Sequence, residues 1–212
     1  MTPSTPALFL ADSLGLDFLN SVATPVDTPV DWLEDGEGLL SWLQQARLVP
    51  DEVISAMRER AIPGEINRLA DQARALREWF RAFVRKHKGH PLKPADLAEL
   101  EPLNQLLKRD ERYGEIIAEA RDEHLALRLV QTRRWISPEA LLLPIAESMA
   151  QLVSMEDFAY VKACEGPTCT LLFVDHTRGH ARRWCSMSLC GNRAKQAAHR
   201  HRLKATTSVQ KA

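Results

Sequence analysis

Four cysteines lie close together near the C-terminus, at Cys164, Cys169, Cys185 and Cys190. They form two C-x4-C pairs that are separated by fifteen residues. Two pairs of thiolates on tight turns supply the four soft donors that tetrahedral zinc requires. Four sulfur ligands leave no open coordination position, so the expected zinc ion is structural and not catalytic. A segment with so small an apolar core would depend on the ion in order to fold.

Other uses of these cysteines fit the pattern less well. Two disulfides would satisfy the count, but disulfides are rare in the cytoplasmic location that we expect for this chain. A redox dithiol more typically has C-x-x-C spacing. His176 or His180 could replace one cysteine, although four thiolates already complete a site. We expect Gly166 to take a positive φ in the first turn, and Gly191 to let backbone approach the thiolates.

The residues after the last cysteine are strongly basic. Asn192 is placed to cap a helix from Arg193 to Lys204, in which the few apolar residues are mostly alanine. Such a helix buries little surface and would form an exposed cationic rod that fits a DNA groove. The candidate nucleic-acid contacts lie on this helix and in the loop before Cys185: Arg178, Arg182, Arg183, Arg193, Lys195, Arg200, Arg202 and Lys204.

The charge of the 212-residue chain is zero overall but unevenly distributed. Residues 161–212 contain ten Lys and Arg and two acidic residues, a formal charge of +8, which leaves −8 on residues 1–160. This asymmetry favours a polyanion as the partner of the basic part, with DNA preferred and RNA as the alternative. The two oppositely charged parts could instead attract each other.

The remaining sequence must position these groups, and its pattern is mainly α-helical. Apolar residues recur at helical spacing, most clearly over 64–88, where we place the arginines outside the apolar stripe. Residues 110–135 instead predict a small β-hairpin. We therefore expect a helical domain at 1–156 and a zinc-ribbon or knuckle module with a basic helix at 157–212. The expected helices are 14–22, 38–48, 51–60, 64–88, 94–108 with a break at Pro102, and 137–153 with Ser137 as its cap.

Several classes of protein are disfavoured. No apolar run approaches the roughly 20 residues that span a bilayer, and the N-terminus lacks the features of a secretory signal. His87, His90 and His124 have no catalytic spacing, and neither a phosphate-binding glycine loop nor G-x-S-x-G is present, so we do not expect an enzyme. His87 and His90 should be solvated, and Asp17 and Asn20 should cap a helix.

The C-terminal motifs resemble the CGNR zinc finger, which is named for its Cys-Gly-Asn-Arg run. The matching segments are Cys164-Glu-Gly-Pro-Thr-Cys169, Leu171-Leu-Phe-Val-Asp175, Arg182-Arg-Trp-Cys185 and Cys190-Gly-Asn-Arg193-Ala-Lys195. The N-terminal part resembles the ABATE domain through Leu16-Asp-Phe-Leu-Asn20, Leu40-Ser-Trp-Leu43 and Leu76–Arg81. One departure is Asn20-Ser21, where the family more often has Asn-Thr.

The resemblance implies a stress-induced transcription regulator of bacteria. It places the zinc ligands on the four cysteines and the basic run of the finger on Arg193 and Lys195. The leading hypothesis is a DNA-binding regulator whose helical domain senses a small-molecule effector or forms a homodimer. The alternatives are an RNA- or ribosome-associated zinc ribbon, and a protein–protein interaction module that docks on a partner such as polymerase.

Overall fold

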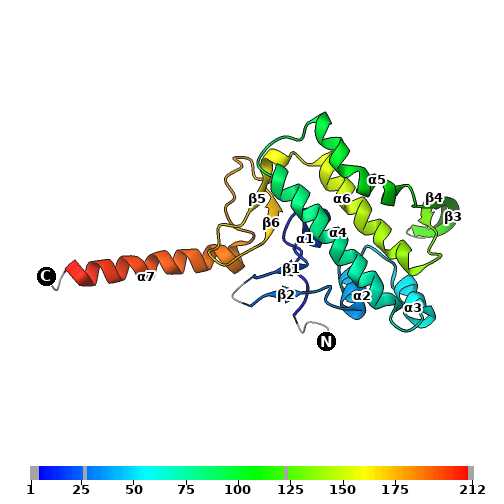
Figure 1. Ribbon diagram of the computed structural model, residues 1–212, viewed down its shortest axis with the longest axis horizontal. Coiled ribbons are helices and arrows are strands. Elements are labelled where there is room, and N and C mark those ends of the chain that lie inside the picture. The colour runs from blue at the N-terminus through cyan, green and yellow to red at the C-terminus, as the bar shows by residue number, and fades with distance from the viewer. Residues whose placement is uncertain (1–4, 26–27, 122–123, 210–212) are drawn as a thin grey trace.

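The computed structural model describes residues 5–25, 28–121 and 124–209, without the side chains of 120–121, 124 and 201–209. The chain is mainly α-helical, as expected, with small antiparallel hairpins and a C-terminal zinc-finger module (Figure 1). None of the helices in these ranges is both long enough and apolar enough to cross a membrane. The helices of the body are α1 (Leu14–Leu19), α2 (Gly36–Gln45), α3 (Asp51–Arg60), α4 (Glu65–His87), α5 (Glu101–Leu107) and α6 (Leu143–Met155).

Helix α1 lies at the centre of the apolar core. It is short, and it contacts α4, α6 and the finger strand β6 (Leu172–Val174). Leu16, Phe18 and Leu19 are fully buried. A helix of six residues would not be stable alone, so it depends on packing against these neighbours on several sides.

Helix α4 carries the apolar stripe that the sequence predicts, but two arginines share its buried face. Arg77 is 3% exposed and Arg81 is 6% exposed, so their placement outside the stripe was wrong. Both are tolerated because they have polar partners: Arg77 forms two 2.8 Å bonds with the Asp31 carboxylate, and Arg81 donates to the carbonyl of Leu19. The positions of charged residues in the sequence do not reveal which polar groups they will contact in the fold.

Prolines divide two of the predicted helices. The first is a 3₁₀ helix, η1 (Pro94–Leu100), followed by α5, which has Pro102 in its first turn. The second is a 3₁₀ helix, η2 (Pro138–Leu142), followed by α6 with Pro144 in its first turn. A proline lacks the N–H that would continue the α-helical hydrogen bonds, so it is tolerated only in the first turn of a new helix. Ser137 precedes η2 but its side chain makes no capping hydrogen bond.

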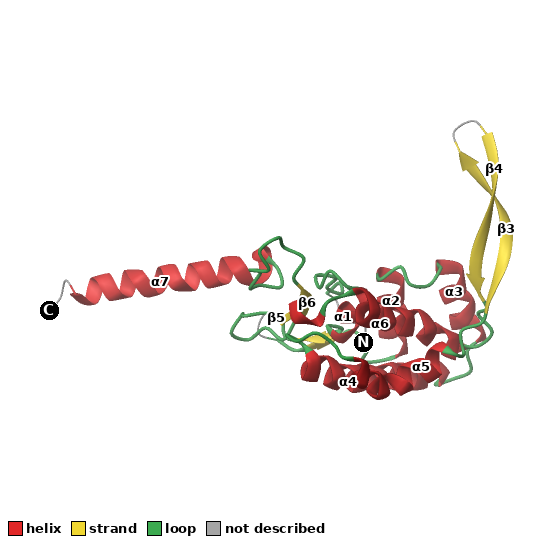
Figure 2. Cartoon of the chain, turned by 90° about the horizontal axis from the view of Figure 1, so that it is seen from above, coloured by secondary structure: helices red, strands yellow, loops and turns green. Residues whose placement is uncertain are grey.

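The predicted hairpin is confirmed and extends away from the body. Strands β3 (Arg112–Arg121) and β4 (His124–Arg133) pair in antiparallel register, with Ile116 opposite Leu129. Figure 2 shows this two-stranded ribbon projecting at the end of the molecule opposite to the C-terminal helix. A second small hairpin, β1 (Val22–Ala23) with β2 (Val30–Asp31), lies near the finger.

The C-terminal part begins with a 3₁₀ turn, η3 (Phe158–Tyr160), and strand β5 (Val161–Ala163), which pairs with β6. A π-helical turn, η4 (Met187–Gly191), then leads into α7 (Asn192–Val209). Asn192 is helical and does not cap α7; Ser186 caps the preceding turn by accepting from the Leu189 N–H. The expectation that Asn192 caps α7 was wrong, because the backbone is already helical in η4, before Asn192. The buried core is continuous from the helices into β5 and β6.

Candidate metal centre and basic helix

The four cysteine sulfurs converge at one point. Their Sγ atoms all lie within 4.8 Å of one another. The Cys185–Cys190 and Cys169–Cys185 sulfur separations are 3.6 and 3.9 Å. A tetrahedral ion with Zn–S bonds of about 2.3 Å needs sulfurs roughly 3.8 Å apart. The arrangement therefore fits one zinc ion with four cysteine ligands, as the spacing predicts.

Hydrogen bonds to sulfur also favour thiolates. The N–H groups of Gly166 and Cys185 donate to Cys164 Sγ at 3.4 and 3.3 Å. The hydrogen bond with Cys185 lowers the pKa of Cys169 to about 5, and the same pairing raises the pKa of Cys185. Four thiolates at this distance repel one another, and a bound cation offsets that repulsion.

Two glycines make room for the cysteine loops, for reasons that differ from the expected ones. Gly166 does not have a positive φ; instead, a Cβ there would lie 3.0 Å from Cys169 Cβ and 3.1 Å from Cys190 Sγ. A Cβ on Gly191 would lie 2.6 Å from Met187 Sδ and 3.2 Å from Trp184 Cδ1. Gly166 therefore leaves room for the cysteine sulfurs. A side chain at Gly191 would instead crowd Met187 and Trp184.

The finger is attached to the helical body through buried polar contacts. The side-chain amide of Asn20 donates to the carbonyl of Leu172 and accepts from the Leu172 N–H, both at 2.9 Å. Asp17 accepts from the N–H groups of Leu10 and Ala11 through one oxygen, at 2.9 and 3.0 Å. The Ala11 carbonyl in turn accepts from the N–H of Val174. Asp17 and Asn20 therefore connect chain segments. Asn20 is also the C-cap residue of α1, as expected, whereas Asp17 lies inside α1, so the expectation that it caps a helix was wrong.

Burial has a strong effect on the Asp17 carboxyl. It is 4% exposed, and desolvation raises its pKa to about 7 despite the two backbone hydrogen bonds, which act in the opposite direction. Asp175, which is fully buried in the finger, behaves differently. Burial would raise its pKa, but hydrogen bonds from Lys162, Thr177 and Arg182 hold its pKa well below the usual range.

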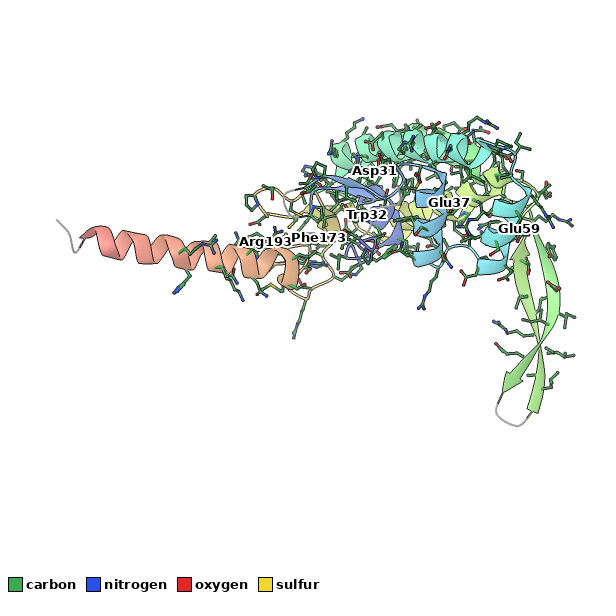
Figure 3. The ribbon with its side chains drawn as sticks, turned by 90° about the horizontal axis from the view of Figure 1, so that it is seen from below. Asp31, Trp32, Glu37, Glu59, Phe173 and Arg193 are labelled. Atoms are coloured by element: carbon green, nitrogen blue, oxygen red, sulfur yellow. The ribbon has the colours of Figure 1, made fainter. Side chains whose placement is uncertain are left out.

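Two of the candidate nucleic-acid contacts, Arg182 and Arg193, make several bonds that join the finger to other segments of the chain. The Arg182 guanidinium donates to the carbonyls of Leu10 and Val174, pairs with Asp12, and stacks over the Phe173 ring at 4.2 Å. Arg193, at the root of α7 where the helix leaves the body (Figure 3), donates to three acceptors. These are the carbonyls of Leu189 at 2.5 Å and Pro25 at 2.7 Å, and Cys190 Sγ at 3.3 Å.

The other described candidates are exposed. Arg178, Lys195 and Arg200 point to solvent, and Arg183 pairs with Glu165 across 2.6 Å. The side chains of Arg202 and Lys204 lie outside the described part, although their backbone is helical. Figure 2 shows α7 extending away from the body beyond its first turn. The structure therefore separates arginines that hold the finger from cations that face solvent.

None of the histidine side chains that the structure describes belongs to the cysteine cluster. His180 Nδ1 bonds the Asp175 carbonyl at 2.8 Å and its ring stacks on Tyr160, while His176 bonds Glu156. His87 is not solvated as expected, because its ring lies between Asp96 and Glu99 of η1 and against Phe83. His124 has no described side chain.

The His87 group lies near a further feature that the sequence reading missed. The ligand atoms of His87, Asp96 and Glu99 lie within 4.8 Å of one another. Lys86 bonds Glu99 at 2.7 Å, and the N–H of Lys93 bonds Asp96 at 2.8 Å, so both carboxylates already have partners. The group ties η1 to the end of α4. In the sequence, the i, i+3 spacing of Asp96 and Glu99 could have indicated that these two carboxylates lie on the same side of a helical turn.

Comparison with known families gives two matches. Residues 12–156 match the family ABATE, described as "Putative stress-induced transcription regulator". Residues 160–203 match the CGNR zinc finger, whose zinc site coincides with the cysteine cluster. No curated protein matches the chain. Because the first match covers more than half of the sequence, the chain belongs to the ABATE family and ends in a CGNR zinc finger.

Proposed function

We propose that this protein is a cytoplasmic, non-enzymatic regulator of transcription that binds DNA through α7 and the adjoining finger loop. Its two families are regulator and zinc-finger families, and their descriptions support a role in the response to stress. The zinc ion holds the finger loops together and takes no part in chemistry, because its four ligands are all cysteines.

The observation that carries this proposal is the way α7 joins the zinc centre. Arg193 bonds a zinc ligand, the preceding turn and the Pro25 carbonyl of the body at once. The first turn of α7 is thereby fixed relative to the body, while residues 195–200 are exposed. A cationic helix held in one direction can enter a groove or follow a phosphate backbone without losing much conformational entropy on binding.

We assign the phosphate contacts to the exposed cations Arg178, Lys195 and Arg200, with Arg183 close by and Arg202 and Lys204 further along the helix. Lys195 and Arg200 lie on neighbouring stripes of α7, so the helix presents charge over a broad face. Arg182 and Arg193 position the finger in this proposal. Contacts of this kind are electrostatic and should depend strongly on salt.

The test is a titration of zinc-loaded protein against labelled duplex DNA at several salt concentrations. We expect tight binding at low salt and a steep negative salt slope. Lys195→Ala with Arg200→Ala should weaken binding on every sequence and reduce the slope by about 0.9 per lost phosphate contact. The matched control is Arg60→Ala, an exposed cation on α3. If the double variant bound as tightly as wild type, the assignment to α7 would be wrong.

Structured RNA serves as the competing ligand in the same titration. A preference for RNA over duplex DNA would replace the DNA proposal with an RNA-binding finger. Binding to neither would point to a protein partner for the finger.

We further propose that an effector acts where the helical body meets the finger. A groove of about 840 Å³ there is lined by Phe9 and Leu10 of the N-terminal segment and by Trp184 and Met187 of the finger. A ligand in this groove would contact both parts and could change the direction of α7. Compounds that raise the melting temperature of wild-type protein should have a smaller effect on Phe9→Ala.

A further inference from the structure

The β3–β4 hairpin has one apolar face that nothing in the described chain covers. Leu125, Leu127 and Leu129 alternate along β4, and Ala118 and Ile116 of β3 pair with Leu127 and Leu129. Paired residues in an antiparallel ribbon share a face, so these five side chains lie together. The exposed fractions of the four large ones are 75% for Leu125 and Leu127, 66% for Leu129 and 70% for Ile116.

The opposite face of the ribbon is mixed. It carries Glu115, Glu119 and Arg128, but also Ile117, Ala126 and Val130. Arg128 Nε lies 3.4 Å from Glu119 Oε2. The described charges between root and tip are therefore confined to this face, and the other face is apolar. A strand pair with one apolar face ordinarily packs that face on an apolar surface. In this molecule the body offers no such surface, because the ribbon points away from it (Figures 2 and 3).

The base of the hairpin is held firmly. Arg133 pairs with Asp110 at 2.6 Å and with Glu147 of α6 at 2.9 Å, and Arg112 pairs with Glu147 at 2.7 Å. This network fixes the direction of the ribbon and neutralises the two arginines at the root of its apolar face. Between the root and the tip, the described side chains of that face carry no charge.

We propose that this apolar face is a dimerisation surface for a second copy of the same chain. An isolated two-stranded hairpin is at best marginally stable in water, and a contiguous exposed apolar patch marks a contact surface. With no described charge between root and tip, the face offers nothing that would recognise a charged ligand or nucleic acid. Its best complement is the same uncharged apolar face on another ribbon of equal length and equal twist, and every copy of the chain supplies one.

The area of the apolar face sets the expected strength of the dimer. A two-fold axis between two ribbons would pack the leucine row of one copy against that of the other, as in sheet-on-sheet packing. Four large aliphatic side chains at about 100 Å² each give on the order of 400 Å² per copy, or about 800 Å² for the pair. This area is at the low end for specific interfaces, so the dimer should be reversible and concentration-dependent. The proposed dimer does not depend on the proposed binding of DNA.

The test is sedimentation velocity of the zinc-loaded, full-length protein from about 1 to 100 µM, a range chosen because small interfaces dissociate at micromolar concentrations. We expect a monomer–dimer equilibrium that high salt does not weaken, because the contact is apolar. Leu127→Lys with Leu129→Lys should weaken dimerisation at least tenfold.

The matched control places the same charges on the other face. Ala126→Lys and Val130→Lys lie on the same strand, and each new lysine stands directly opposite a glutamate, Glu119 or Glu115. These changes should leave the dimer intact. Unchanged circular dichroism and zinc content in both double variants would establish that the fold is retained. A wild-type monomer at every concentration overturns the proposal, and so does equal dimerisation by the two double variants.

Discussion

Asn20 at the end of α1 and Leu172 in the finger strand β6 exchange two hydrogen bonds of 2.9 Å, although 152 residues separate them in sequence. The side-chain amide of Asn20 acts as a short piece of β-strand, since it donates and accepts as a backbone amide does. Both partners are buried, so neither Leu172 group can turn to water instead. This contact joins the helical body to the zinc finger.

Asn20→Ala should therefore destabilise the protein. Removing the amide leaves a buried N–H and a buried carbonyl unsatisfied, which costs about 2–4 kcal/mol. Urea unfolding of the zinc-loaded protein measures the change. Asn20→Asp is the informative companion, because a carboxylate can accept from Leu172 N–H but cannot donate to its carbonyl. A loss below about 0.5 kcal/mol in both variants would show that the contact contributes little.

The Asp17 carboxyl predicts an unusual pH dependence. Its pKa is raised from 3.8 to about 7, so between these values the folded state binds the proton that the unfolded state has released. Stability from this group is therefore greatest at low pH and falls as pH rises toward 7. Between pH 5.5 and 8 the loss should be about 2 kcal/mol.

Asp17→Asn isolates this effect. The asparagine keeps an oxygen for both backbone hydrogen bonds, which converge on one carboxylate oxygen in the wild type. The difference in unfolding free energy between variant and wild type should grow from pH 5.5 to about 8, in favour of the variant, and then level off. Measurement above pH 5.5 avoids acid release of zinc. A difference that does not change with pH would contradict the raised pKa.

Gly166→Ala should weaken zinc binding. The new methyl would crowd Cys169 Cβ at 3.0 Å and Cys190 Sγ at 3.1 Å, and so would force ligands apart. We expect zinc affinity to fall by about tenfold or more, as for other changes that displace metal ligands. Competition with a chromophoric chelator measures this. Gly179→Ala is the control within the finger, because a Cβ there meets nothing within 4 Å; equal affinities for the two variants would rule out the crowding argument.

Arg193 and Arg200 should respond differently to removal although both lie on α7. Arg193→Ala removes bonds to Leu189, Pro25 and Cys190, so it should lower thermal stability and zinc affinity together with DNA binding. Arg200→Ala removes an exposed cation and should change DNA binding and its salt slope alone. Melting curves, zinc competition and DNA titration on the same two preparations compare them. Identical profiles would mean that the division between positioning and contacting arginines is wrong.

Local features of this protein follow from its sequence. The spacing of the four cysteines predicts the zinc centre, because paired thiolates on short loops bring their sulfurs together whatever the rest of the chain does. The apolar stripe of α4 and the leucine alternation of β4 likewise predict a helix and a strand, since periodicity reports which side chains share a face. These are short-range properties, set within a few turns of backbone.

Only the tertiary structure decided which polar residues hold the molecule together and which face solvent. In sequence, Arg77, Arg182 and Arg193 look like Arg178 and Arg200, yet the first three bond buried or distant groups and the last two are exposed. Asn20 is the C-cap residue of α1, yet its side chain, like that of Asp17, binds the backbone of another segment. The physical reason is that a buried polar group needs a partner, and that partner comes from wherever the fold places one, which no local pattern records.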